Sequence, residues 1–271
     1  MKRLLHLKDK HKGARGFAVG NGPSLLMSDL DRIAGDVSVG SNKIYLAYKK
    51  THWRPTYYTA IDEYVINNIK HKIAKQDQPV FLPSQFSDGW GDTGNVHFLP
   101  LLFSGKDKKG VYQTGFSEEA SQGFYGGQSV TYFNLQLLAW MGCNPIIMVG
   151  VDFCFDTPTE SDKDPIYGDV YKSQNEVNHF DKNYRQRGEL WTQPKYAEMQ
   201  ASFDFGNAAL KQKGVKLINA SRQSKLKNIK RMSLDDALEP PALSVGLFQN
   251  RSHPRHKMRP QPVKIQESIT A

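Results

Sequence analysis

The 271-residue sequence lacks any uninterrupted apolar run of about 18 residues, which is the length that a membrane-spanning helix needs. Residues 1–15 also lack the apolar stretch of a secretory signal peptide. Only two cysteines are present, Cys143 and Cys154, and their place in or beside an apolar segment fits reduced packing residues better than a disulfide framework. We therefore expect a cytoplasmic protein with no transmembrane segment.

Three chemical signatures are missing as well. The glycine-rich turn at 20–24 has no Lys-Ser/Thr pair, which argues against an ordinary P-loop ATPase. Dinucleotide enzymes often carry an acidic residue about 20 positions after their glycines, whereas this chain has Ser41-Asn42 there, so hydride chemistry is disfavoured. The acidic pair in Asp29-Leu30-Asp31 lies on a helical pattern rather than in a loop. We expect no metal site from these residues.

The net charge of +9 is concentrated at the two ends of the chain. Residues 1–15 carry six Lys/Arg and one Asp, and residues 240–271 carry five Lys/Arg and one Glu, which leaves 25 basic and 25 acidic residues in 16–239. We expect a basic N-terminal extension, a folded domain at 16–239 and a disordered, Pro-rich basic tail. Contact of the ends with an anionic membrane or with nucleic acid stays open.

Within 16–239, short apolar runs alternate with helical patterns. This alternation predicts an α/β, Rossmann-like three-layer fold with a mainly parallel sheet and helices on both faces. The expected strands are 16–20, 36–41, 57–62, 79–83, 95–103, 145–152 and 215–220, and the clearest helices are 63–76, 128–141 and 194–213. The run at 145–152 is so continuously apolar that we place it at the centre of the sheet.

Two polar segments match neither pattern, namely 84–94 and 154–192. A connection this long in a compact domain is usually functional or disordered. The second segment directly follows the central strand, where α/β sheets bind their ligands, so we interpret it as a lid or acceptor loop.

The strand at 16–20 runs into Gly20-Asn21-Gly22-Pro23-Ser24. Glycines allow close approach of a ligand, and Pro23 suits the first turn of a helix, so backbone N–H groups here can form a phosphate cradle. The side chains of Asn21 and Ser24 can bond ribose or phosphate oxygens. A purely structural tight turn is an equal alternative.

Polar residues end three further strands. Asn42 can contact a base or sugar, or cap the helical segment that follows it. Asp62 and Asp152 can hold a metal, orient a hydroxyl or cap a helix, and Asp152 is a candidate catalytic residue. Capping is the simpler role for Asp62 because a helix begins at Glu63, whereas no helix directly follows Asp152.

The long polar segment contains the sequence Asn178-His-Phe-Asp-Lys-Asn-Tyr-Arg185. Histidine is the usual base for deprotonating a hydroxyl near neutral pH, so His179 is a candidate catalytic base. Lys182 and Arg185 are candidates for neutralising a departing phosphate. The simpler alternative for His179 is a surface residue that only makes hydrogen bonds.

Taken in order, these motifs resemble the 6-hydroxymethylpterin diphosphokinase-like domain over about residues 16–238. That domain occurs in archaeal pterin kinases and in bacterial flagellin-glycosylation and surface-polysaccharide proteins. The opening turn and the Gly150-Val-Asp152 strand end are also similar to those of bacterial sialyltransferases that use a CMP-linked sugar.

The sialyltransferase resemblance implies donor contacts for Gly20, Asn21, Gly22, Ser24, Asn42, Asp62 and Ser129, with a loop histidine as base. Two positions depart from that pattern. Cys154 stands where those enzymes have a tyrosine that steadies the leaving phosphate, and Asn183 stands where their histidine lies, about four positions after His179.

We therefore expect a transferase that binds a nucleotide-linked donor, with a CMP-sugar favoured, and that glycosylates a glycan or small-molecule acceptor in surface polysaccharide or glycan synthesis. One alternative is ATP-dependent pyrophosphate transfer, with Mg²⁺ near Asp62 or Asp152. Another is a non-catalytic module that binds a nucleotide or nucleic acid. The sequence leaves the sugar, the acceptor and the oligomeric state unidentified.

Overall fold

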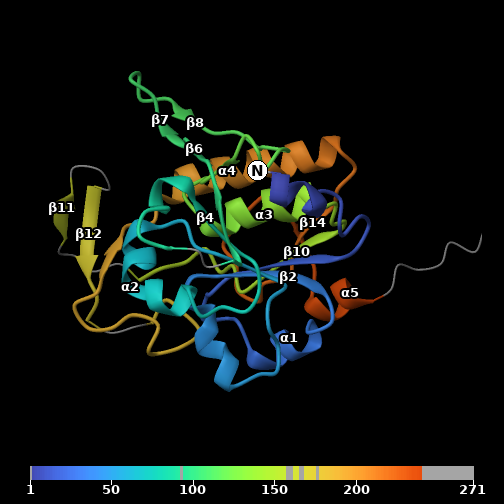
Figure 1. The fold of residues 1–271 in the computed structure, drawn as a ribbon, viewed down its shortest axis with the longest axis horizontal. Helices are drawn as coiled ribbons and strands as arrows, with labels where there is room; N and C mark the ends of the chain where they lie inside the picture. The colour runs from blue at the N-terminus through green and yellow to red at the C-terminus, as the bar shows by residue number, and fades with distance from the viewer. Residues whose placement is uncertain (1, 92–93, 157–160, 165–167, 175–176, 240–271) are drawn as a thin grey trace, which may run out of the picture. The chain divides into compact units, whose positions relative to one another are not determined.

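Eight parallel strands form the main sheet of the computed structural model, which describes residues 2–91, 94–156, 161–164, 168–174 and 177–239 (Figure 1). Across the sheet the strands are β15 (Lys230–Arg231), β14 (Leu217–Asn219), β10 (Ile146–Val149), β1 (Gly16–Val19), β2 (Val37–Ser41), β3 (Tyr57–Thr59), β4 (Val80–Pro83) and β5 (Val96–Leu99). The predicted mainly parallel α/β sheet is confirmed. The predicted tail at 240–271 lies outside the described residues.

The order of the strands reverses at β1. The chain leaves β1 toward β2 and later returns to β10, which pairs with the other side of β1 from Gly16 opposite Ile146 to Val19 opposite Val149. In open α/β sheets such a reversal leaves a crevice outside the carboxyl ends of the two strands. We call the edge at which these parallel strands end the carboxyl edge.

Helices cover both faces of the sheet, as predicted (Figure 1). Ile146 and Met148 of β10 pack into one apolar cluster and Ile147 and Val149 into the other, which is the alternation of a strand buried on both faces. Helices α3 (Val130–Trp140) and α4 (Tyr196–Gln212) contribute to the first cluster; α1 (Met27–Arg32), η2 (Asn42–Lys49), α2 (Glu63–Ile73) and α5 (Leu234–Leu238) contribute to the second.

The polar segment 154–192 contains more regular structure than we expected. Strands β11 (Asp162–Asp164), β12 (Gly168–Lys172) and β13 (Leu190–Thr192) form a separate antiparallel sheet. Tyr171 pairs with Trp191 across it, and their ring centroids are 5.0 Å apart. The sequence does not reveal these strands because they are short and contain few apolar residues.

Several other short elements were also missed. Pro100 interrupts the single strand expected at 95–103, which divides into β5 and β6 (Leu101–Leu102). The remaining elements are η1 (Lys2–Leu7), η3 (Ser84–Phe86), β7 (Gly105–Lys106), β8 (Tyr112–Gln113) and β9 (Phe124–Tyr125). None of the helices in the described residues is long and apolar enough to span a membrane.

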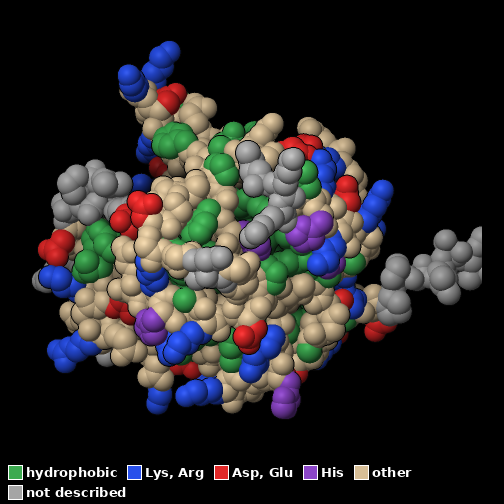
Figure 2. All heavy atoms as spheres, in the orientation of Figure 1, with side chains coloured by type: hydrophobic (Ala, Val, Ile, Leu, Met, Phe, Trp, Pro, Cys, Tyr) green, Lys and Arg blue, Asp and Glu red, His purple; other side chains and the backbone are tan. Residues whose placement is uncertain are grey.

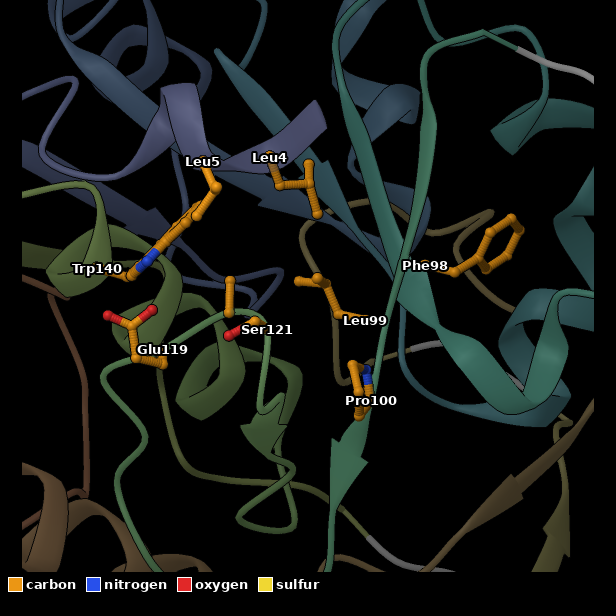
Figure 3. A pocket seen from close by; sticks show the side chains of 9 residues that line it. Leu4, Leu5, Phe98, Leu99, Pro100, Glu119, Ser121 and Trp140 are labelled. Atoms are coloured by element: carbon orange, nitrogen blue, oxygen red, sulfur yellow. The ribbon is translucent and has the colours of Figure 1, made fainter. Parts of the chain in front are cut away.

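The N-terminal stretch packs against the domain. Leu4 and Leu7 of η1 are buried, and the backbone N–H groups of Asp9, His11 and Gly13 donate to carbonyls at the end of α3. Side chains from η1, β5 and α3 converge around a hollow of about 30 Å³ (Figure 3). Ligand pockets usually measure about 300–1,000 Å³, so this hollow is a packing defect rather than a binding site.

Two phenylalanines on α4 provide a matched test of this packing. Phe203 is 0% exposed and Phe205 is 48% exposed. We expect Phe203→Ala to lower the free energy of unfolding by about 3–5 kcal/mol because it leaves a cavity in the core. Phe205→Ala should change it by less than about 1 kcal/mol. Urea denaturation measures the free energy of unfolding of both variants. Equal losses of this free energy would contradict the orientation of α4, in which Phe203 is buried and Phe205 is exposed.

Candidate functional site

The turn after β1 lies against the segment that follows β10. The N–H groups of Gly20 and Gly22 donate to the carbonyls of Val149 and Gly150, each over 2.8 Å. A Cβ atom on Gly22 would lie 2.5 Å from an oxygen of Asp152, so this glycine is required by close packing. These hydrogen bonds join the segments that follow β1 and β10 beside the crevice.

Three of the N–H groups expected in the predicted phosphate cradle, those of Gly20, Gly22 and Ser24, already donate to groups of the protein. Besides Gly20 and Gly22, the N–H of Ser24 donates to Asp152 over 2.7 Å and that of Leu25 donates to Gly22. Helix α1 also begins at Met27 rather than at Pro23. These N–H groups are already hydrogen-bonded because the turn packs against a segment almost 130 residues later in the chain. The sequence of the turn itself does not reveal this contact.

Asp152 holds this turn in place. It is 5% exposed, and its two carboxylate oxygens accept hydrogen bonds from the N–H and the hydroxyl of Ser24. Its own carbonyl accepts the N–H of Lys225 over 2.9 Å. The geometry therefore makes Asp152 and Ser24 positioning residues, and their predicted catalytic and donor-binding roles stay predictions.

Two asparagines stand at the carboxyl ends of the adjacent strands β1 and β2. Asn21 donates its side-chain N–H to the Ser41 carbonyl over 3.2 Å. Asn42 has a φ of +55° and does not cap η2, contrary to the simpler role considered for it. The side-chain oxygens of Asn21 and Asn42 are both buried and have no hydrogen-bond partner among the described residues. A buried acceptor of this kind is suited to an N–H or O–H group of a ligand.

Residues 177–189, which we call the strap, pass over these asparagines. The N–H of Phe180 donates to the carbonyl of Asn21 over 3.0 Å. Lys43 pairs with Glu189 over 2.6 Å, with both side chains at most 11% exposed. A second ion pair, 2.6 Å long, joins Lys50 to Asp181. The predicted lid is thus attached to η2 through Lys43 and to the residue just after η2 through Lys50.

His179 lies on the strap next to Phe180. Its ring stacks on that of Tyr184 at a centroid distance of 3.7 Å and meets the ring of Phe155 edge-on at 5.6 Å. These contacts fix the plane of the imidazole beside the crevice. The sequence does not reveal the roles of Tyr184, Lys43 and Glu189, because their partners are distant in the chain or belong to the packing of the strap itself.

The two predicted phosphate-stabilising residues differ in their environment. Arg185 stacks over the ring of Trp191 at 4.3 Å, and its charge acts on Asp62. Lys182 is exposed on the strap. The structure therefore places Arg185, but not Lys182, in a fixed position near the other candidate residues.

Asp62 and Ser129 each cap a helix that begins at the carboxyl edge. Asp62 accepts the N–H of Val65 over 3.1 Å, so the simpler role considered for it is confirmed. Burial raises the pKa of this carboxyl, and the backbone hydrogen bonds and Arg185 oppose the rise. Ser129 accepts the N–H of Thr131 over 3.3 Å at the start of α3.

A divalent metal does not fit the predicted carboxylates well. Both oxygens of Asp152 are bonded to Ser24, and Asp62 caps α2. Across the described ranges, no group of three or more His, Cys, Asp or Glu side chains is arranged to hold a metal ion.

Comparison with known proteins found one solved structure similar to this chain, titled "Structure of MAf glycosyltransferase from Magnetospirillum magneticum AMB-1". The TM-score is 0.53 at 12% sequence identity, and the alignment covers 84% of this chain but only 35% of that one. At this identity the likeness supports the fold alone. No curated protein sequence matches.

A family model described as "6-hydroxymethylpterin diphosphokinase MptE-like" matches residues 1–158. The match contains the turn after β1, Asn42, Asp62, Ser129 and Asp152, whereas the strap lies beyond it. Because the matched residues make up more than half of its length, the chain belongs to the 6-hydroxymethylpterin diphosphokinase MptE-like family.

Proposed function

We propose that this protein is a transferase that binds a nucleotide-linked donor in the crevice beneath the strap and transfers a glycosyl group to an acceptor hydroxyl. The observation that carries this proposal is the pair of buried, unpartnered side-chain oxygens on Asn21 and Asn42. Each such group costs about 1–3 kcal/mol when it is left unsatisfied. A ligand that displaces the groups covering these oxygens and donates hydrogen bonds to both would recover this energy.

A nucleotide has the donors that this pair needs. Its base carries N–H groups and its ribose carries hydroxyls, while the crevice lies at the strand-order reversal where α/β proteins bind such ligands. The MptE-like family and the glycosyltransferase neighbour support a transferase. The resemblance to sialyltransferases favours a CMP-linked sugar and a glycan acceptor, and the proposed setting is the cytoplasm.

His179 is the proposed base. Its imidazole would accept the proton of the acceptor hydroxyl while the bond between the sugar and its phosphate breaks. The stack on Tyr184 keeps the ring in one orientation, which lowers the entropic cost of aligning it with the acceptor. Arg185 is the group that we propose offsets negative charge on the leaving group.

The family's description favours a second candidate, which is pyrophosphate transfer from ATP. In that reaction Mg²⁺ would neutralise the phosphates, but Asp62 and Asp152 are engaged in capping and in bracing the turn. Turnover in the presence of EDTA separates the two candidates, because undiminished activity would exclude a Mg²⁺-dependent diphosphokinase.

A non-catalytic module that binds nucleic acid through general charge has less support. Residues 16–239 are electrically balanced, and on the face shown in Figure 2 the Lys and Arg side chains are dispersed among acidic ones. A nucleic-acid site would require a contiguous basic surface.

Asn42→Gly tests the donor site. Glycine accepts the φ of +55° and removes the unpartnered oxygen, so the unliganded protein should keep its melting temperature. We expect the Kd of the tightest-binding nucleotide to rise at least about tenfold. Thermal-shift titration with CMP, CMP-sugars, UDP-sugars, GDP-sugars and ATP measures both quantities.

Asn228→Gly is the matched control, because Asn228 is exposed and has a φ of +62°. It should leave nucleotide binding unchanged. Equal weakening by the two variants would reject Asn42 as a ligand contact, and the absence of any shift with every nucleotide in wild-type protein would reject the proposed function.

His179→Ala tests the base. We expect kcat to fall about 100-fold or more with little change in donor Kd, because the side chain acts on the acceptor proton. His52→Ala, at an exposed loop position, should keep full activity. Steady-state kinetics with the donor identified by the titration provide the measurement, and a near-normal kcat for His179→Ala would refute the assignment.

A further inference from the structure

A hairpin at residues 103–114 projects from the body of the domain (Figure 1). Its strands, β7 and β8, pair only with each other among the described residues. The segment contains three lysines and one aspartate, so we call it the basic hairpin. An isolated two-stranded hairpin is at best marginally stable in water, so this one depends on its turn and on the helix behind it.

The turn of the basic hairpin is held by its own aspartate. One carboxylate oxygen of Asp107 accepts the N–H groups of Lys109 and Val111, and the other accepts the side-chain N–H of Gln113 over 3.1 Å. The hydrogen bond from Val111 is the main cause that holds the pKa of Asp107 below its usual range. The only acidic group of the hairpin is thus bonded within the turn, whereas Lys108 and Lys109 are exposed at its tip.

One side of the basic hairpin packs toward α4. Lys106 is paired with Tyr112 across the two strands. The Tyr112 hydroxyl lies 2.7 Å from that of Ser202 on α4, and the Lys106 ammonium lies 3.8 Å from a carboxylate oxygen of Glu198 on the same helix. Because side chains alternate along a strand, the neighbouring residues point away from α4.

The opposite side carries two exposed apolar side chains, Phe103 at 66% and Val111 at 55% exposed. The ring of Phe103 lies over Gly105, where an added Cβ would meet it at 2.9 Å. Gly105 pairs with Gln113, two positions after Val111, so both apolar side chains belong to this side. In Figure 2 the projection carries basic side chains at its end and hydrophobic ones beneath them.

The base of the basic hairpin is attached at the carboxyl edge. Gln128 donates its side-chain N–H to the carbonyl of Ser104 over 2.9 Å. Gln128 directly precedes Ser129, which caps α3 at that edge. A surface bound by the hairpin would therefore be linked to the edge that contains the crevice.

We propose that the basic hairpin docks this protein on an anionic lipid membrane. The charges at the tip complement anionic headgroups, and Phe103 and Val111 supply apolar groups that enter the boundary between headgroups and acyl chains. The long stems of Lys108 and Lys109 let their ammonium groups stay among the phosphates while the apolar side chains enter. This inference does not depend on the proposed transferase function.

Two features favour a membrane over a protein surface. The apolar pair lies on a convex projection, which fits a deformable layer without a matching groove. A second copy of this chain would bring the same lysines to the contact, and like charges disfavour such an association.

Sedimentation of the full chain with lipid vesicles tests the inference. One set of vesicles contains phosphatidylcholine alone, and the other also contains about one-third phosphatidylserine. We expect binding only to the second set, and binding that weakens as the salt concentration rises. Equal binding to both sets, or binding to neither, would overturn the proposal.

Two double variants locate the contact. Lys108→Gln/Lys109→Gln should lower the partition coefficient on anionic vesicles about tenfold or more, because each lysine near the charged surface adds to binding. Phe103→Ser/Val111→Ser should lower it by a similar factor, because the apolar groups no longer enter the lipid. All four side chains are exposed, so the melting temperature should stay unchanged.

Matched controls exclude an effect of charge or hydrophobicity in general. Lys72→Gln/Lys75→Gln removes the same charge from exposed positions in α2 and just after it. Leu26→Ser removes an exposed apolar side chain outside the hairpin. Both controls should keep wild-type binding. Equal losses in the controls and the hairpin variants, or full binding by the hairpin variants, would assign binding to other parts of the chain and overturn the proposal.

Phe103→Trp reports whether the hairpin enters the lipid. We expect the emission of the added tryptophan, taken as the difference from wild-type protein, to shift to shorter wavelength with anionic vesicles only, because indole moves into a less polar layer. An unchanged emission maximum would overturn insertion. Sedimentation equilibrium without vesicles tests the alternative occupant, and a dimer that Phe103→Ser/Val111→Ser dissociates would assign this face to a second copy instead.

Discussion

The two hydrogen bonds from Ser24 to the carboxylate of Asp152 determine the arrangement of the candidate site. They close the turn after β1 against the segment after β10, at the point where the strand order reverses. One consequence is that Asn21 faces the end of β2, where it bonds Ser41. The backbone carbonyl of the same Asp152 accepts the N–H of Lys225, so the segment after β14 is held at this edge by a separate contact. The crevice therefore depends on one buried carboxylate.

The sequence predicted the main sheet well because parallel strands buried on both faces appear as continuous apolar runs, as at Ile146–Val149. It also placed Asn42, Asp62 and Asp152 at the carboxyl edge, although β3 and β10 end three residues before the two aspartates. It failed where a partner lies far along the chain. The N–H groups of Gly20 and Gly22 suggested a phosphate cradle, but they bond backbone carbonyls after β10. The residues around the turn cannot reveal that its N–H groups are already hydrogen-bonded to a segment so far along the chain.

The family match and the proposed chemistry cover different parts of the molecule. Residues 1–158 include the crevice, with Asn21, Asn42 and the brace at Asp152. The proposed base and the strap lie after that match. The family match therefore contains the proposed donor contacts but not the proposed base.

The buried pair of Lys43 and Glu189 has a consequence for how ligands reach the crevice. Two charges removed from water lose hydration energy that their mutual attraction offsets only in part. Any separation of the strap from η2 would return both ions to water, so it would cost less than the number of broken contacts suggests. The ion pair therefore fixes the position of the strap more than it adds to the stability of the fold.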